Sequence, residues 1–244
     1  MAAIIELKEV NFLAQDRKVI QEISIEFEES KITAIIGPSG SGKSTVLKIS
    51  AGLLVPDGGE VLYKGKNIAL MSRSENLDFR REAAFVFQDS ALWANQNLDQ
   101  ILELPLKIHY PKMKAQERAK KIREVAGLVG YKKNLAIRPS SLSMGEQKLI
   151  AFARAMLCNP SLLFLDEWVE SLDETSANNL IEVVKRKKKE GASIIFVCHD
   201  MRIIRDLADS IVVIVDGKEA FEGTKEDLLN SPELKNFLKM EIAV

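Results

Sequence analysis

The sequence predicts an α/β protein with a mostly parallel sheet, an N-terminal antiparallel β part and an inserted α-helical subdomain. Short, almost continuous apolar segments such as residues 32–36 are typical of strands that are covered on both faces of a parallel sheet. Amphipathic helical patterns lie between these segments, and strands that alternate with helices indicate βαβ units. The stretch from about residue 97 to 157 breaks the alternation, because it has helical periodicity and no clear strand. An inserted helical part is the simplest explanation.

The antiparallel part is expected near the N-terminus. Ile23, Ile25 and Phe27 alternate with polar residues, which is the period of a half-buried strand. Residues 4–10 and 60–65 have the composition of further strands. These segments therefore predict antiparallel pairing before the parallel sheet begins.

Further strands of the parallel sheet are predicted at four apolar runs. These are residues 84–87, 162–165, 194–198 and 211–215. A helix between two of them is marked by apolar residues at i, i+3, i+4 and i+7. These residues are Ala177, Leu180, Ile181 and Val184. Because no linker interrupts the chain, we expect one domain over residues 1–244, with a core of 1–88 and 159–244 and a helical subdomain at about 89–158.

Composition excludes several classes of protein. The 244 residues include 34 basic and 35 acidic side chains, a balance that argues against a general nucleic-acid binder. No apolar run approaches the roughly 18 residues of a membrane-spanning helix, and no signal peptide is expected at the N-terminus. Cys158 and Cys198 lack metal-ligand spacing and fit a reducing compartment. We therefore expect a soluble intracellular protein.

A phosphate-binding loop follows the apolar run 32–36. It fits the pattern G-x-x-x-x-G-K-[ST]. Its residues are Gly37, Pro38, Ser39, Gly40, Ser41, Gly42, Lys43, Ser44 and Thr45. Such a loop lets backbone N–H groups bind phosphates at a helix N-terminus, with Lys43 on the terminal phosphates and the Ser44 hydroxyl on Mg²⁺. The alternative is an ordinary Gly/Ser-rich turn, which would not require both a preceding strand and a following helix.

Two carboxylates and a histidine follow other predicted strands. Asp166 and Glu167 end the apolar run 162–165, and beside a phosphate loop they predict a Mg²⁺ ligand and a general base for the attacking water, respectively. His199 follows the run 194–198, so it is expected at the sheet edge where ligands bind, near the γ-phosphate. A structural histidine is the alternative for His199, and His109 has no comparable context.

The motifs and their order resemble the ATP-binding subunit of ABC transporters over essentially the whole chain. In order they are the phosphate loop 37–45, Gln88, Leu142–Gln147 (Leu-Ser-Met-Gly-Glu-Gln), Ala153-Arg154-Ala155, Asp166-Glu167, Ser171-Leu172-Asp173 and His199. The segment 142–147 is called the signature segment below. The resemblance implies a P-loop NTPase core of the RecA-like type and an ATPase that uses ATP and Mg²⁺.

The resemblance also implies how the residues would work together. Two subunits would face head to tail as a homodimer and enclose two ATP molecules. One subunit would supply the phosphate loop, Gln88, Asp166, Glu167 and His199, with Ser44, Gln88 and Asp166 at the metal. Ser143 and Gly145 would come from the other subunit, at a helix N-terminus, and Asp173 would help to join the two sites. Closure and reopening of the dimer would drive integral membrane permease subunits, and these subunits would hold this chain on the cytoplasmic face of the inner membrane.

Three positions depart from the family pattern. Met144 and Glu146 replace a glycine and a glutamine of the usual signature. Ala14 stands where an aromatic residue usually stacks on adenine, and Phe12 is the nearest aromatic candidate for that role. Trp168 replaces the proline after the catalytic glutamate, so a less rigid turn is expected. Together these departures predict slow basal ATP hydrolysis.

Two segments are similar to the ATPases of Mla or MCE-type lipid transport systems. They are residues 85–106 and the C-terminal segment 223–240, which is expected to end in a helix at about 231–240. This similarity implies phospholipid transport across the envelope and an MCE-type or other substrate-binding protein as a partner. The alternatives are the ATPase of another ABC importer, a soluble ABC ATPase of the iron–sulfur assembly type, and a nucleotide-switched cell-division scaffold.

Two further features have competing interpretations. Leu92 and Trp93 are expected either to line a groove for a permease helix or to pack in the core of the helical part. The basic run 185–189 is expected to be a solvated helix end, where cations complement the helix dipole, rather than a membrane or nucleic-acid site.

Overall fold

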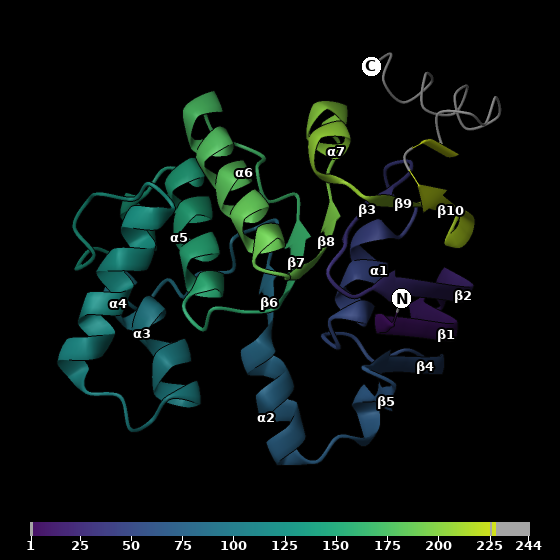
Figure 1. The fold of residues 1–244 in the computed structure, drawn as a ribbon, viewed down its shortest axis with the longest axis horizontal. Coiled ribbons are helices and arrows are strands. Elements are labelled where there is room, and N and C mark those ends of the chain that lie inside the picture. The colour runs from purple at the N-terminus through teal and green to yellow at the C-terminus, as the bar shows by residue number, and fades with distance from the viewer. Residues whose placement is uncertain (1, 225, 228–244) are drawn as a thin grey trace. The chain divides into compact units, whose positions relative to one another are not determined.

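The computed structural model describes residues 2–224 and 226–227. Contacts divide the chain into two units. Figure 1 labels the helices and strands of the chain. The first unit is formed by Met1–Ser72 with Ser193–Val244, and the second by Arg73–Ala192. The expected helical subdomain at about 89–158 stays a prediction.

An antiparallel sheet forms the N-terminal part of the first unit. Its order is β2-β1-β4-β5. The strands are β1 (Ala3–Ala14), β2 (Arg17–Glu28), β4 (Gly58–Tyr63) and β5 (Lys66–Asn67). Ile23, Ile25 and Phe27 are each about 1% exposed, as their alternation predicts. The antiparallel N-terminal part is therefore confirmed, and the hairpin between β1 and β2 is longer than the sequence pattern indicates.

A second sheet of the first unit contains the parallel strands. Its strands are β10 (Lys218–Thr224), β9 (Ser210–Val215), β3 (Ile32–Ile36) and β8 (Ser193–Val197), in that order. The strand β3 pairs in parallel with both β8 and β9, and β10 pairs antiparallel with β9. All residues of β3 and β8 are buried, in agreement with sequences that are apolar except for Thr33 and Ser193.

Two helices and a short 3-10 turn complete the described part of the first unit. They are α1 (Lys43–Ser50), α7 (Met201–Leu207) and η1 (Ile68–Leu70). The helix α1 contacts strands of both sheets, namely β1, β2, β3 and β8. Its apolar side buries Val46, Leu47 and Ile49 completely. This packing fixes the N-terminus of α1, where the phosphate loop ends.

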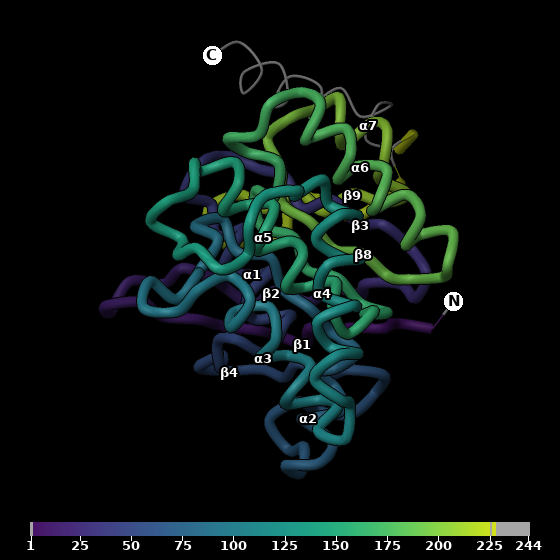
Figure 2. Tube along the Cα trace, turned by 90° about the vertical axis from the view of Figure 1, so that its left-hand side faces the viewer, coloured from purple at the N-terminus to yellow at the C-terminus, as the bar shows by residue number. Residues whose placement is uncertain are grey.

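The second unit is mainly helical. Its elements are α2 (Arg73–Glu82), β6 (Ala83–Val86), α3 (Leu98–His109), α4 (Ala115–Leu128), η2 (Pro139–Ser141), α5 (Met144–Met156), β7 (Leu162–Asp166) and α6 (Glu174–Lys189). The helices α3, α4 and α5 contact one another, and Figure 2 follows the chain through them. None of residues 87–161, all of which the structure describes, lies in a strand. The helical interruption of the α/β pattern is confirmed.

Some elements were not predicted. The helix α2 has few apolar residues, and only Phe79 of the helix is buried. The strand β10 is largely exposed and lacks an apolar run. The helix expected at about 231–240, and most of the segment 223–240, lie outside the described residues. Within the described part of the chain, no helix has both the length and the apolar character needed to cross a bilayer.

Candidate nucleotide site

The phosphate loop connects β3 to α1 in the first unit. Gly37 has φ 145° and Gly42 has φ 103°, which are left-handed conformations that favour glycine. A Cβ atom at Gly37 would lie 2.0 Å from the carbonyl oxygen of Ile214, and one at Gly42 would lie 2.8 Å from Cδ1 of Ile20. The φ angles favour glycine at both positions, and at Gly37 the close approach of the Ile214 backbone also leaves no room for a Cβ atom.

Lys43 is folded back over this loop. Its Nζ donates hydrogen bonds to the carbonyl oxygens of Gly37 and Pro38, both at 2.7 Å, and the side chain is 6% exposed. Ser41 Oγ is buried and has no hydrogen-bond partner among the residues that the structure describes. The Lys43 cation and the unpartnered Ser41 hydroxyl, both beside the N-terminus of α1, suit a phosphate group.

His199 belongs to the same edge of the same sheet. The strands β3 and β8 are parallel, with Ile35 opposite Val197, so the phosphate loop and His199 both follow the carboxyl ends of neighbouring strands. His199 is exposed, and the next residue, Asp200, caps α7 by accepting from Arg202 N at 2.8 Å. The placement agrees with a histidine that faces a ligand at this edge.

Phe12 lies on the hairpin beside the phosphate loop. Its register partner on β2 is Ile20, and the Ile20 side chain reaches the position where a Cβ of Gly42 would be. Phe12 is half-buried, whereas Ala14 is exposed at the end of β1. Stacking of Phe12 on adenine stays a prediction.

The second unit carries the predicted carboxylates at the end of β7. Asp166 and Glu167 are 1% and 7% exposed. Glu167 has φ 44°, a left-handed conformation that costs a non-glycine residue about 1–3 kcal/mol and is concentrated at functional sites. Because β6 pairs in parallel with β7, Gln88, which follows β6, lies at the same edge of this strand pair as Asp166 and Glu167. Its Nε2 donates to Glu170 Oε2 at 3.2 Å.

Oxygen donors in these segments fit a magnesium ion. Carboxylate and amide oxygens are ligands that Mg²⁺ prefers, and within the second unit Asp166 and Gln88 offer one of each kind. The carboxylate of Asp166 directly ends a fully buried strand, so its backbone is firmly held. The donor set thus suits the expected metal.

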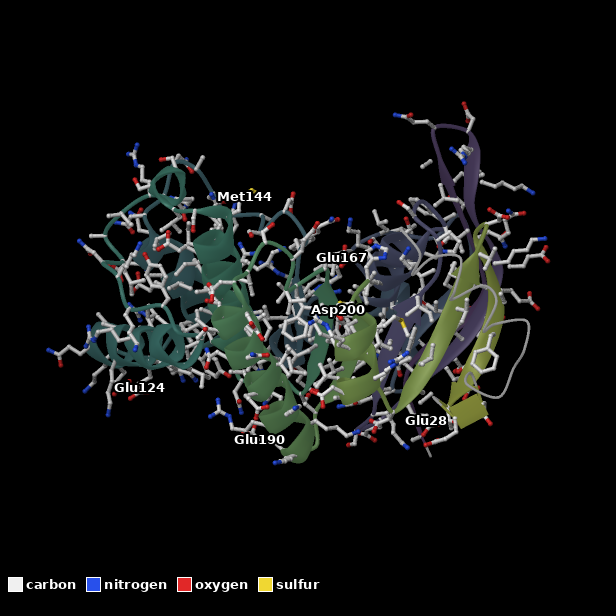
Figure 3. The ribbon with its side chains drawn as sticks, turned by 90° about the horizontal axis from the view of Figure 1, so that it is seen from above. Glu28, Glu124, Met144, Glu167, Glu190 and Asp200 are labelled. Atoms are coloured by element: carbon white, nitrogen blue, oxygen red, sulfur yellow. The ribbon has the colours of Figure 1, made fainter. Side chains whose placement is uncertain are left out.

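The signature segment begins the helix α5. Ser143 is the N-cap residue: Ser143 Oγ accepts from Glu146 N at 3.2 Å, and Glu146 Oε2 accepts from Ser143 N at 3.0 Å. This capping box uses the unusual Glu146 within its own chain. Met144, which Figure 3 labels at the start of α5, is 71% exposed. A Cβ at Gly145 would lie 3.0 Å from Ser171 O, so the glycine permits close approach of the loop after β7.

Two further positions of the family pattern, Asp173 and Trp168, have structural contacts within the second unit. Asp173 caps α6 through Ser176 N at 3.0 Å, and this hydrogen bond lowers the pKa of the Asp173 carboxyl. Trp168 is completely buried, with its ring centroid 5.8 Å from that of Phe152. Trp168 directly follows Glu167, and its side chain is therefore fixed in the core. This differs from the less rigid turn that the missing proline predicts.

Sequence reasoning missed the role of Lys148. Its side chain is 3% exposed, and its Nζ donates to the carbonyl oxygens of Gln88 and Glu167. Arg154 donates in the same way to Ala91 O at 2.6 Å and Ser90 O at 3.1 Å. The sequence gives one signal for these roles, namely a charged residue on the buried face of a helix. It does not show which carbonyl groups that residue bonds, because these depend on tertiary structure.

Burial tests the interpretations of three other features, which are Trp93, the basic run 185–189 and His109. Trp93 is 44% exposed, and the Arg154 guanidinium lies 5.6 Å from its ring, so core packing does not describe it. The basic run 185–189 is not wholly solvated, as Lys187 is 5% exposed and bonds to Asn159 Oδ1 at 3.1 Å. Burial lowers the pKa of His109, which ends α3.

A strand, a glycine-rich loop and a helix that presents lysine and serine together define a phosphate-loop nucleotide-binding protein. A sequence model of the family described as ABC transporter matches residues 20–170. The chain belongs to this family, and it is an ATPase subunit of an ABC transporter that binds ATP.

Known relatives span nearly the full length of the chain. The intermembrane phospholipid transport system ATP-binding protein MlaF of Haemophilus influenzae is 33% identical, over 98% of this chain and 91% of that protein. MlaF of Escherichia coli K12 is 31% identical over 96% of this chain and 87% of that protein. The methionine import ATP-binding protein MetN of Corynebacterium jeikeium is 31% identical over 88% of this chain, but only 58% of MetN is covered.

A solved structure has the same fold. The ATP-binding cassette MJ0796, in a dimeric post-hydrolysis state bound to ADP and Pi, aligns with a TM-score of 0.83 and 28% identity. The alignment covers 90% of this chain and 98% of that one. The P-loop ATPase fold expected from the motifs is therefore confirmed.

Proposed function

We propose that the chain powers a transporter that moves phospholipid across the cell envelope. Support comes from the two MlaF proteins, whose similarity extends over 91% and 87% of their own lengths. MetN has comparable identity, but 42% of its length has no counterpart in the alignment, since 58% is covered. A methionine-type importer is the second candidate on the strength of that identity.

The proposed roles follow from the chemistry of the residues. The phosphate loop and Lys43 bind the phosphates of ATP, and His199 contacts the γ-phosphate. Glu167 is the general base that polarises the attacking water, a role worth about 10²–10⁴ in rate. Ser44, Gln88 and Asp166 would hold Mg²⁺, which supplies Lewis-acid stabilisation of phosphate charge. Among these features, the loop with Lys43 bent over Gly37 and Pro38 is the observation that carries ATP binding.

The active unit is proposed to be a homodimer that encloses two ATP molecules. Ser143 and Gly145 would act on the partner's nucleotide from the N-terminus of α5. Support comes from the exposed first turn of α5 and from the dimeric form of the cassette MJ0796. The Glu167→Gln variant tests this, because it should bind ATP without hydrolysing it. We expect an ATP-dependent dimer in light scattering after gel filtration, and a monomer that still hydrolyses ATP would contradict the assignment.

The partners are proposed to be integral membrane permease subunits, with an MCE-type protein as a further component. They would hold the chain at the cytoplasmic face of the inner membrane. Purification from detergent-solubilised membranes through a tag on this chain, followed by mass spectrometry, should recover the permease. Reconstitution of that complex distinguishes the two candidates, because phospholipid extracted by the partner should stimulate ATPase activity in one case and methionine in the other.

A further inference from the structure

Lys148 is a buried cation that joins two segments of the second unit. It lies on α5, and its Nζ donates to the carbonyl oxygen of Gln88 in a short hydrogen bond. The same Nζ donates to the carbonyl oxygen of Glu167 at 3.2 Å. One ammonium group therefore touches the main chain of two residues of the proposed mechanism, Glu167 at the attacking water and Gln88 at the metal.

Charge burial at this position is costly. Burial lowers the pKa of Lys148, whereas the carboxylates of Glu170, Asp166, Glu167 and Asp89 act in the opposite direction. A buried charge in such surroundings is often no more stabilising than an apolar side chain of similar size. Stability alone is thus a weak reason for an ammonium group here, and its geometry offers a stronger one.

The second cation of α5 shows what Lys148 adds. Arg154 also bonds to main-chain carbonyls after β6, those of Ser90 and Ala91. The segment after Gln88 is therefore held to α5 at two points. Lys148 also provides a hydrogen bond from α5 to the carbonyl oxygen of Glu167. Loss of Lys148 should consequently affect Glu167 more than it affects the segment 88–91.

We propose that Lys148 is a positioning residue that holds the main chain of Glu167 and Gln88 to the signature helix α5. This inference rests on the proposed function, in which Glu167 polarises water for ATP hydrolysis. The left-handed backbone of Glu167 (φ 44°) needs such support, because strained conformations persist only where surrounding contacts fix them. The phosphate loop belongs to the other unit, so we expect ATP binding to depend little on Lys148.

Lys148→Met tests the proposal with Lys187→Met as its matched control. Lys187 is a buried lysine of the same unit, 5% exposed, whose Nζ bonds to Asn159 Oδ1 and to Glu190 Oε2 at 3.0 Å, away from Glu167 and Gln88. Figure 3 labels Glu190 at the end of α6. Both variants lose one buried ammonium group, but only the first loses the contact to Glu167.

The measurement is steady-state ATPase activity of the purified full-length chain. Misplacement of a catalytic group by about 1 Å can cost about 10²-fold, so Lys148→Met should lower kcat by about 10- to 100-fold. The ATP KM should stay within about threefold, because binding of the ground state is untouched. Lys148→Arg, which keeps a charged donor, should regain most of the lost kcat, and Lys187→Met should keep the wild-type kcat.

Equal loss of kcat in Lys148→Met and Lys187→Met would overturn the proposal, as would a failure of Lys148→Arg to regain activity. If thermal unfolding shows that Lys148→Met is unfolded at the assay temperature, Lys148→Gln decides between the same outcomes. Glu167→Gln is measured in parallel. An inactive wild type, or full activity in Glu167→Gln, would contradict the proposed function itself, whereas an inactive Glu167→Gln with an active Lys148→Met contradicts only the positioning role.

Discussion

Lys133 Nζ lies 2.6 Å from Glu146 Oε1, at the first turn of the signature helix α5. The hydrogen bond from Lys133 lowers the pKa of the Glu146 carboxyl, and the Ser143 backbone acts in the same direction. The carboxylate that replaces the usual glutamine therefore has a cation beside it. This pair explains how a negative charge is accommodated at a helix N-terminus that is proposed to face the γ-phosphate of ATP.

Lys133→Ala should weaken ATP-dependent dimerisation in the Glu167→Gln background, because it exposes the Glu146 charge to the partner's nucleotide. We expect about a 2- to 5-fold higher ATP concentration for half-maximal dimer, consistent with an exposed ion pair worth about 0.2–1 kcal/mol. Light scattering across an ATP titration measures it. The double variant Lys133→Ala/Glu146→Gln should restore the wild-type midpoint, and no restoration would exclude charge as the cause.

Trp168 should contribute to stability through its ring rather than its N–H group. Nε1 is buried and has no partner among the described residues, so Trp168→Phe removes an unsatisfied donor and should change the unfolding free energy little. Trp168→Ala should lower it by about 3–5 kcal/mol, because it leaves a cavity beside Phe152. Urea unfolding of both variants measures these values. Equal losses would indicate that Nε1 has a partner in solution.

Gly37→Ala should damage the phosphate loop more than Gly40→Ala. Both glycines have positive φ, 145° and 75°, but only at Gly37 does a new Cβ meet backbone, the Ile214 carbonyl oxygen at 2.0 Å. Gly40→Ala should therefore cost about 1–2 kcal/mol from φ alone. Gly37→Ala should cost more and should abolish binding of a fluorescent ATP analogue. Similar affinities of the two variants would contradict the clash.

Stability should fall slightly as the pH rises from about 5 to 7, because of Glu222. Partial burial of its carboxyl group, together with the charges of Glu219 on the same strand and of Glu26 and Glu28 on β2, raises its pKa from 4.5 to about 7. Figure 3 labels Glu28 in this region. The folded state then holds more protons than the unfolded state between these pH values, so the unfolding free energy falls as Glu222 ionises and is level above about pH 7.

Melting temperatures of the wild type and Glu222→Gln between pH 5 and 8 test this linkage. The effect should be small, since Glu222 as a whole residue is exposed and solvent screens its charge. The variant should have the flatter profile, and Glu60→Gln, at another exposed position, should keep the wild-type slope. Parallel slopes in all three proteins would exclude Glu222 as the titrating group.

Local chemistry explains which parts of the structure are predictable from the sequence. Residues 32–36 were predicted as a strand and form β3 with the same bounds, because an apolar β-branched run before a glycine-rich loop has few alternatives. His199 lies at the predicted sheet edge for the same reason, as parallel strands deliver their carboxyl ends together. Each of these features follows from an apolar strand and the residues that directly follow it in the sequence.

Other features depend on tertiary structure and could not be predicted. The helix α2 is mostly polar, so periodicity gives no signal for it beyond Phe79. The sequence marks Lys148 only as a charged residue among apolar residues of a helix, and its hydrogen bonds to Gln88 and Glu167 depend on how α5 packs. The pairing of Lys133 with Glu146 likewise joins a loop to a helix. Polar residues at the site are therefore the least predictable part of the molecule.

The helix α5 sets a fixed spacing between its two tasks. Ser143 caps its start, and Lys148 must point toward the carbonyl groups of Gln88 and Glu167. One residue inserted or deleted between them would turn Lys148 by about 100° around the helix axis. Side chains such as Met144 and Glu146 can therefore vary between related chains, whereas the length of this segment cannot. Alignment gaps should be absent there even where identity is low.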